Sequence, residues 1–376
     1  MLLSRKRAPT PKPSAAKPSA SQKRQHGTGT NVPSTLQVAA TYNAIITRAG
    51  GDRVWLKRAA EPMGGERERR TDGEVLALGP AEQAIIRAVE QQAANDGLRL
   101  QVQPTDPPKG GAALTTDELS VSEGNRIVCV WRLRRVARLY RAAIVIDDLG
   151  QDLKPTSELL EIPYPLTFSI LPNLPASRET AVAANRAGRE VMLHLPMEPL
   201  AAQVSPGEGA IRVGMRGPEV DRLIESDLAS VPYVAGVNNH MGSRATSDPP
   251  LMAAVMKELA SRRLYFIDSR TTASTVALDA ARRAGIPAFY RSVFLDDTEN
   301  LEYTLGQLQR FRAAVEQRGG ALAIGHPHST TIAALKEFLP QLERDDIEVV
   351  PASRLAGGPE GARLPAAPVG SNGSED

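Results

Sequence analysis

The stretch "AAIVIDDLG", residues 142–150, runs from an apolar segment directly into two adjacent aspartates. No polar residue alternates through Ala143–Ile146, which is typical of a strand buried on both faces of a parallel sheet. Two carboxylates at the end of such a strand lose hydration and repel each other unless a positive charge lies nearby. The sequence therefore predicts a positively charged partner for Asp147 and Asp148.

Seven more strand-like runs follow, and helical patterns separate most of them. The runs are "PLTFSI" (165–170), "EVMLHL" (190–195), "VAGVNN" (234–239), "LYFID" (264–268), "AFYRSVF" (288–294), "ALAIGH" (321–326) and "IEVVPAS" (347–353). Asp248 with Pro249 is typical of a helix start, and Gly188, Gly285 and Gly319 are typical of helix ends. Eight strands alternating with helices predict an α/β fold whose parallel sheet closes into a barrel, with an open doubly wound sheet as the alternative.

The rest of the chain differs in composition from residues 141–356, which form the predicted barrel. Residues 1–34 are rich in Lys, Pro, Ser and Ala and are expected to be a disordered basic tail, and residues 357–376 a disordered C-terminal tail. Residues 35–140 combine helical and alternating patterns and predict a small α+β domain without catalytic residues. Within it, residues 105–124 are expected to form a loop.

Composition narrows the classes of function. A single cysteine among 376 residues excludes an intramolecular disulfide framework and a zinc site built from several cysteines. The formal net charge is +2, but residues 1–24 carry seven Lys or Arg and no acid, so the remainder is mildly acidic. This distribution argues against a nucleic-acid-binding fold. No secretory signal and no stretch of about 20 apolar residues is visible, which predicts a protein without a transmembrane segment.

Polar residues gather where the predicted strands end, and these ends share one rim in a parallel fold. The first strand ends in Asp147 and Asp148, the third in His194, the fourth in Asn239 and His240, the fifth in Asp268 near Arg270, and the seventh in His326 and His328. Taken singly, such an aspartate is more often a helix cap and such a histidine a structural residue. Two acids and three or four histidines at one rim are together a metal-ligand set. Glu198, Asp296 and Asp297 are instead expected to face solvent or cap helices.

A divalent cation would explain the paired aspartates. It stabilises one aspartate as a carboxylate, and the other is then close enough to handle the protons of a metal-bound water. Two imidazoles and one carboxylate leave coordination positions open, as in a catalytic site. Zn²⁺ suits this set best, with cobalt, nickel, manganese or iron as alternatives. Residues 196–216 are too long for an ordinary connection and are expected to form a substrate loop.

Five motifs in this order, "IDDLG", "LHLPMEP", "NNHMGS", "FIDSRT" and "GHPH", resemble those of the divergent polysaccharide deacetylases, relatives of the NodB-type carbohydrate esterases. The resemblance covers roughly residues 142–355. It implies a distorted (β/α) barrel and metal-dependent removal of acetyl groups from the amino sugars of a polysaccharide or glycan. Unlike the better-known deacetylases, the sequence has no H-x-x-x-H motif, so its two candidate histidine ligands come from separate strands.

The resemblance also implies a role for each rim residue. Asp147 matches the general base, and His326 matches the acid that protonates the leaving amine. The metal ligands are Asp148, His194 and His240, whereas Asp268, Arg270, Asn239 and His328 are expected beside the ligands or the substrate. His328 is the weaker candidate for the acid, because the two histidines of "HPH" should point in different directions.

Two functions remain open at this point. The first is a metal-dependent glycan deacetylase. The second is a catalytically weak or inactive barrel that acts as a cell-envelope binding or scaffolding protein, with a partner bound through residues 35–140. The resemblance implies a periplasmic or cell-envelope location, whereas the absence of a visible export signal predicts the cytoplasm. An acetylated glycan is the expected substrate, and nucleic acid is not an expected partner.

Overall fold

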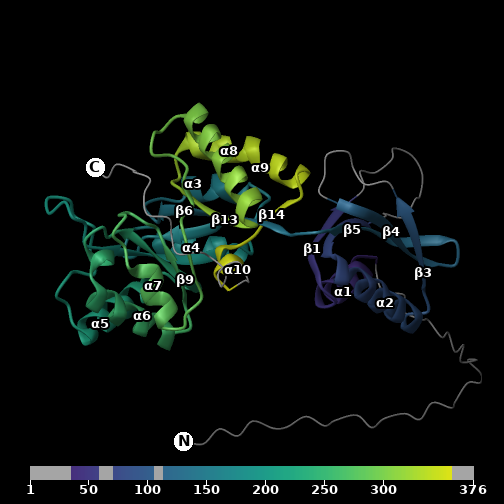
Figure 1. Cartoon of the computed structure of the whole chain (residues 1–376), viewed down its shortest axis with the longest axis horizontal. Helices are drawn as coiled ribbons and strands as arrows, with labels where there is room; N and C mark the ends of the chain where they lie inside the picture. Colours follow the sequence, from purple (N-terminus) through teal and green to yellow (C-terminus); the bar gives the residue numbers. More distant parts are fainter. Residues whose placement is uncertain (1–34, 59–70, 106–112, 358–376) are drawn as a thin grey trace, which may run out of the picture.

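The computed structural model describes residues 35–58, 71–105 and 113–357 (Figure 1). The predictions of disordered tails at both ends of the chain concern residues outside these ranges, apart from Gly357. Within the described ranges, no helix has both the length and the apolar composition that crossing a membrane requires.

A five-stranded sheet and two helices make up the first part of the described chain. The helices are α1 (Thr35–Arg48) and α2 (Gly79–Asn95), and the strands are β1 (Gly51–Arg58), β2 (Thr71–Leu78), β3 (Arg99–Thr105), β4 (Ala113–Glu123) and β5 (Arg126–Val136), in the order β1-β2-β5-β4-β3. Both helices pack against the sheet around the stacked rings of Tyr42 and Trp131. The loop predicted over residues 105–124 is wrong, because β4 occupies most of it and buries Leu119 and Val121 in this core.

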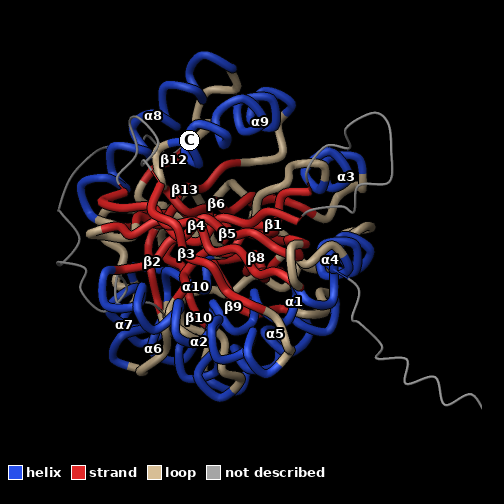
Figure 2. Tube along the Cα trace, turned by 90° about the vertical axis from the view of Figure 1, so that its right-hand side faces the viewer, coloured by secondary structure: helices blue, strands red, loops and turns tan. Residues whose placement is uncertain are grey.

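A sheet of parallel strands forms the second part. Its strands are β6 (Tyr140–Leu149), β7 (Thr167–Ile170), β8 (Glu190–Met197), β9 (Val234–Met241), β10 (Tyr265–Asp268), β11 (Ala288–Tyr290), β12 (Val293–Phe294), β13 (Gly320–Gly325) and β14 (Ile347–Val349). The strand order is β11-β10-β9-β8-β7-β6-β13-β12, and β14 pairs with β6. The longer helices around it are α3 (Lys154–Leu160), α4 (Ser177–Arg186), α5 (Gly217–Ser230), α6 (Pro249–Ser261), α7 (Ala277–Arg283), α8 (Leu301–Arg318) and α9 (Ser329–Arg344). A 3-10 turn, η1 (Ala245–Ser247), follows β9. Figure 2 shows the helices surrounding the strands.

Residues 288–294 supply both edge strands of this sheet, β11 and β12. The strand predicted over 288–294 is divided, because β11 pairs with β10 and β12 pairs with β13 at the opposite edge. Between them, the Arg291 amide donates to the Asp268 carbonyl (2.9 Å) and the Ser292 amide donates to the Leu322 carbonyl (2.7 Å). The sheet therefore curls into a half-barrel whose gap is spanned by two residues. This confirms the predicted α/β barrel class and excludes the open doubly wound alternative.

The amino ends of the barrel strands are closed by a short helix, α10 (Ala352–Ala356). Leu355 packs into the apolar interior of the curl, beside side chains such as Val145 and Phe289. Glu190, the first residue of β8, accepts a hydrogen bond from the Ser353 amide (3.1 Å) at the start of this helix. Because this end is sealed, the carboxyl ends of the strands are the open end of the barrel.

The five-stranded sheet is joined to the closed end of the barrel. Arg134 on β5 forms a buried ion pair with Asp346 (2.6 Å), the residue before β14. Arg138 donates a hydrogen bond to the carbonyl of Arg318, at the C-terminus of α8. Since β6 begins at Tyr140 and runs away from this junction, the sheet lies at the opposite end from the carboxyl ends of the strands (Figure 1).

Candidate metal centre

Both aspartates of β6 reach the open end because the strand is irregular at its last residues. Val145 faces the barrel interior, so regular alternation would send Asp147 inward and Asp148 outward. The register of β6 against β7 shifts between Ile146 and Leu149, which marks a β-bulge. Asp148 adopts a left-handed backbone with a φ of 56°, a conformation that aspartate tolerates better than most residues. The bulge thereby brings the second carboxylate to the same side as the first.

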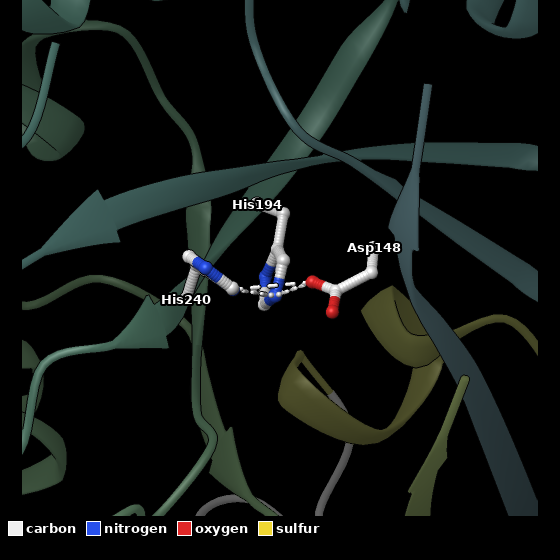
Figure 3. Close-up of side chains that lie close together, drawn as sticks. All are labelled: Asp148, His194 and His240. Carbon is white, nitrogen blue, oxygen red and sulfur yellow. Dashed lines mark hydrogen bonds and ion pairs between the residues drawn. The ribbon is translucent and has the colours of Figure 1, made fainter. Parts of the chain in front are cut away.

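Three candidate ligand atoms from three strands lie close together (Figure 3). Oδ1 of Asp148 is 3.1 Å from Nε2 of His194 and 3.1 Å from Nδ1 of His240, and the two nitrogens are 3.2 Å apart. This buried oxygen accepts no hydrogen bond from the residues that the structure describes. Ligands about 2.0–2.1 Å from a tetrahedral zinc ion lie roughly 3.3 Å from one another. The donor atoms and their spacing therefore fit a small transition-metal ion.

The charges around this triangle favour a cation. Burial raises the pKa of the Asp148 carboxyl, but His194 and His240 outweigh burial and hold that pKa well below its usual range. Burial lowers the pKa of His194, but Asp147 and Asp148 outweigh burial and raise it. The two aspartates thus produce a negative potential at the ligand atoms, which a proton or a metal ion can neutralise.

An arginine that the sequence analysis did not consider adds a fixed positive charge. Arg291, in the link between β11 and β12, donates from Nε to the Ser269 carbonyl (2.6 Å) and from Nη2 to the Arg270 carbonyl (2.8 Å). Burial and the nearby charge of Arg270 lower the pKa of Arg291, whereas the carboxylates of Asp268 and Asp147 act in the opposite direction. The position of Arg291 beside the carbonyls that follow β10 could not be predicted from the sequence, because residues 288–294 were predicted as one strand and not as two.

His326 lies on the other side of Asp148 and is held by a second aspartate. Its Nε2 is 3.8 Å from Asp148 Oδ2, and its Nδ1 is 3.0 Å from Asp296 Oδ1. The other oxygen of Asp296 accepts hydrogen bonds from the His326 amide (2.6 Å) and from Thr331 Oγ1 (2.7 Å). Burial lowers the pKa of His326, but Asp296, together with the charges of Asp147 and Asp148, outweighs burial and raises it to about 9. The imidazole is therefore held as a cation at neutral pH.

The prediction that Asp296 faces solvent or caps a helix is wrong, because this side chain is only 5% exposed and orients His326. Asp296, His326 and His328 form a second group of possible ligands. Both oxygens of Asp296 are already engaged, however, and His328 is 39% exposed with its Nδ1 3.7 Å from Glu299. The group is better described as a hydrogen-bonded Asp–His pair beside a rim histidine.

The remaining predicted rim residues shape the strand ends around the ligands. Asp268, whose pKa is raised by burial, accepts a hydrogen bond from the Arg270 amide (2.8 Å). Asn239 accepts from the Ser269 amide (2.9 Å) and donates to the Met241 carbonyl (2.7 Å). These contacts connect the ends of β9 and β10 and do not involve the three ligand side chains.

The long connection after β8 is tied to the rim by Glu198. This residue accepts hydrogen bonds from the Val213 amide (2.7 Å) and from Arg244 (3.0 Å), and its own amide donates to the Ile211 carbonyl (2.9 Å). The expectation that Glu198 faces solvent or caps a helix is therefore wrong. It holds both ends of residues 198–216 beside the turn that follows β9.

Comparisons with known proteins agree with this architecture. Residues 144–356 match the family described as divergent polysaccharide deacetylase. The chain is 39% identical over 220 residues to the uncharacterized protein YibQ of Escherichia coli, covering 58% of this chain and 68% of YibQ. It is 37% identical over 218 residues to an uncharacterized protein of Haemophilus influenzae, covering 57% of this chain and 76% of that protein.

A solved structure shares the fold. The uncharacterized protein ATU2773 of Agrobacterium tumefaciens is 23% identical and superposes with a TM-score of 0.56, covering 58% of this chain and 90% of that chain. Because the family match spans more than half of the chain and includes every strand end described above, the chain belongs to the divergent polysaccharide deacetylases.

Proposed function

We propose that the chain is a metal-dependent hydrolase that removes acetyl groups from the amino sugars of a polysaccharide or glycan. The observation that carries this proposal is the triangle of Asp148, His194 and His240, whose buried carboxylate oxygen faces two histidine nitrogens at 3.1 Å. Membership of the family supports an acetylated glycan as the class of substrate.

These three residues would hold the ion, and Zn²⁺ suits one carboxylate and two imidazoles best. When bound, the ion polarises the acetyl carbonyl and makes water a better nucleophile. Asp147 takes the proton of the attacking water as general base. His326 gives a proton to the amine nitrogen as the C–N bond breaks, so that acetate and a free amine leave.

The two proton-handling residues differ in the way this division requires. Asp147 is a buried carboxylate whose Oδ1 accepts a hydrogen bond from Asn238 (2.8 Å). His326 is a cation at neutral pH because Asp296 raises its pKa to about 9. A base and an acid on opposite sides of one metal ligand can act on the water and on the leaving nitrogen in turn.

The test measures acetate release from N-acetylated chitooligosaccharides by the zinc-loaded full chain. His326→Gln is expected to lower turnover by about 10²–10⁴-fold without changing zinc content, because it removes a general acid and no ligand. His328→Gln is the matched control, since its ring centre lies 5.9 Å from that of His326, and it should lower turnover less than about 10-fold. Zinc binding without acetate release from any acetylated glycan would contradict the hydrolase and favour a binding or scaffolding protein.

A further inference from the structure

Asn238 is the centre of a hydrogen-bond network that joins four neighbouring strands. This side chain on β9 is 0% exposed. Its Oδ1 is 2.8 Å from His194 Nδ1 on β8 and 2.8 Å from Ser169 Oγ on β7, and its Nδ2 is 2.8 Å from Asp147 Oδ1 on β6. Two strands separate β9 from β6 in the sheet, so only the curl of the barrel lets one amide reach both.

The neighbours of this amide allow one arrangement of protons. The amide nitrogen of Asn238 donates to Asp147 Oδ1. The amide oxygen then faces Ser169 and His194, and each of these must donate. His194 Nδ1 therefore carries a proton, so the neutral imidazole has its lone pair on Nε2, where it faces the other two ligand atoms.

The competing arrangement would block the ion. Asp147 Oδ2 lies 3.5 Å from His194 Nε2, at the outer limit of a hydrogen bond. A proton on Nε2 would give this carboxylate a charge-assisted partner and occupy the lone pair that a metal needs. Asn238 opposes that arrangement from both sides, because it donates to the other oxygen of Asp147 and accepts the proton on Nδ1.

We propose that Asn238 is a positioning residue that orients a metal ligand and the general base with a single amide. Its oxygen selects the metal-binding tautomer of His194, and its nitrogen holds the carboxylate of Asp147. The half that concerns Asp147 rests on the proposed function, whereas the half that concerns His194 needs only a bound ion. Substitutions at this position should therefore separate metal affinity from turnover.

Two substitutions separate the roles. Asn238→Asp has the same shape and still accepts from His194, but it replaces the donor to Asp147 with a second carboxylate. Asn238→Leu removes both contacts. Gln307→Leu is the matched control, because this buried amide lies on α8 and accepts a hydrogen bond from Arg310 instead. Thermal unfolding of all three full-length variants checks that each is folded at the assay temperature.

Zinc affinity is measured by competition with a chromophoric chelator, and turnover by acetate release. Asn238→Leu should weaken zinc binding by about 10–100-fold, the effect typical of losing a residue that orients a ligand. Asn238→Asp should bind zinc within about threefold of the unmodified protein, because the acceptor for His194 is kept, but turn over about 10²-fold more slowly. Gln307→Leu should bind zinc within about threefold of the unmodified protein, because its amide contacts no ligand.

A spectroscopic readout follows the tautomer directly. Long-range ¹H–¹⁵N NMR of the zinc-loaded full chain should show His194 bound through Nε2 and protonated at Nδ1. Asn238→Asp should keep this signature, and Asn238→Leu should lose the hydrogen-bonded Nδ1 proton signal.

The outcomes distinguish the two proposals. Unchanged zinc affinity in Asn238→Leu, or an equal loss in Gln307→Leu, overturns the positioning of His194. Normal turnover in Asn238→Asp overturns the positioning of Asp147. If the unmodified protein binds zinc but releases no acetate, the proposed function and the positioning of Asp147 are both overturned. The positioning of His194 is then still tested by the zinc affinities of the variants. If it binds no zinc, both proposals are overturned.

Discussion

Both ends of the barrel hold partly buried carboxyl side chains, but these are satisfied differently. At the amino ends, Oε1 of Glu190 accepts hydrogen bonds from Thr167 (3.1 Å), Tyr265 (2.8 Å) and the Ser353 amide (3.1 Å). At the carboxyl ends, Oδ1 of Asp148 is buried against two imidazoles and accepts no hydrogen bond from the described residues. A polar group with its partners in place supports the fold, whereas an oxygen that lacks them and faces two imidazoles is able to accept a metal ion.

Left-handed backbone occurs at both ends of the barrel, because Tyr233, Arg263 and Asp346 adopt it shortly before β9, β10 and β14. Asp148, Met241 and Arg270 have φ values of 56°, 49° and 50°, and they lie at the ends of β6 and β9 and just after β10. The backbone conformation therefore does not separate the two ends. The difference lies in the Asp148 oxygen that faces two imidazoles, and the predictions below test this contrast.

The largest effect is expected from Asp148→Asn. Asparagine tolerates the left-handed backbone but removes the charged ligand, so zinc affinity should fall by about 10³-fold or more. The unfolding temperature of the metal-free protein should fall as well, because the variant loses the carboxylate charge that pairs with His194 and His240. Chelator competition and calorimetry measure the two quantities. A variant that kept its zinc affinity would place the ion elsewhere in the molecule.

The opposite pattern is expected at the closed end. Glu190→Gln weakens the hydrogen bonds to α10 and should lower the free energy of unfolding by about 1–3 kcal/mol, with zinc affinity unchanged. Glu225→Gln on the exposed face of α5 is the control and should change the free energy of unfolding by less than about 0.5 kcal/mol. Urea unfolding compares the variants. Loss of zinc binding by folded Glu190→Gln would show that the two ends are coupled.

The smallest effect concerns a buried carboxylate outside the ligand cluster. Asp227 on α5 has one oxygen without a hydrogen-bond partner among the described residues, as Asp148 does. Burial raises the pKa of Asp227 to about 7, with the charge of Glu208 adding to the rise and the hydrogen bond from Asn173 opposing it. Asp227 lowers the cost of its buried charge by taking up a proton. The charge of Asp148 is instead balanced by the two histidines beside it.

The pH dependence of stability tests this assignment. Because the folded pKa lies above the unfolded value of 3.8, the folded state binds the proton more tightly. The contribution of Asp227 is therefore fully present below about pH 4 and falls by at most about 1.4 kcal/mol per pH unit up to about pH 7. Asp227→Asn should be more stable than the unmodified protein at pH 8 by about 1–2 kcal/mol, with little difference at pH 4. Equal stabilities of Asp227→Asn and the unmodified protein at both pH values would contradict a raised pKa of Asp227.

Much of the open end could be predicted from sequence, because parallel strands place their carboxyl ends at one rim. This reasoning brings Asp148, His194 and His240 together without knowledge of the helices, and the structure places their ligand atoms side by side. Their roles in binding and catalysis stay predictions. The fold class followed from the same alternation of strands and helices.

The features that the sequence did not predict depend mainly on contacts between residues far apart in the chain, which local sequence patterns do not encode. Asp296 orients His326 only because the two-residue strand β12 pairs with β13, and two residues are too few for a periodic signal. Asn238 was missed because its partners lie on three other strands. β4 was predicted as part of a loop, although Leu119 and Val121 alternate with polar residues as in a strand and are buried.

The pairing of the last described strand with the first strand of the barrel has a consequence for synthesis. Val349 on β14 pairs with Ala142 on β6, which the ribosome makes about 200 residues earlier. Contacts of such long sequence separation form late. The five-stranded sheet, complete by Val136, can fold while the barrel is still being translated. The apolar interior around Val145 stays uncovered until α10 emerges, so the nascent barrel is the part of this chain that needs protection from aggregation.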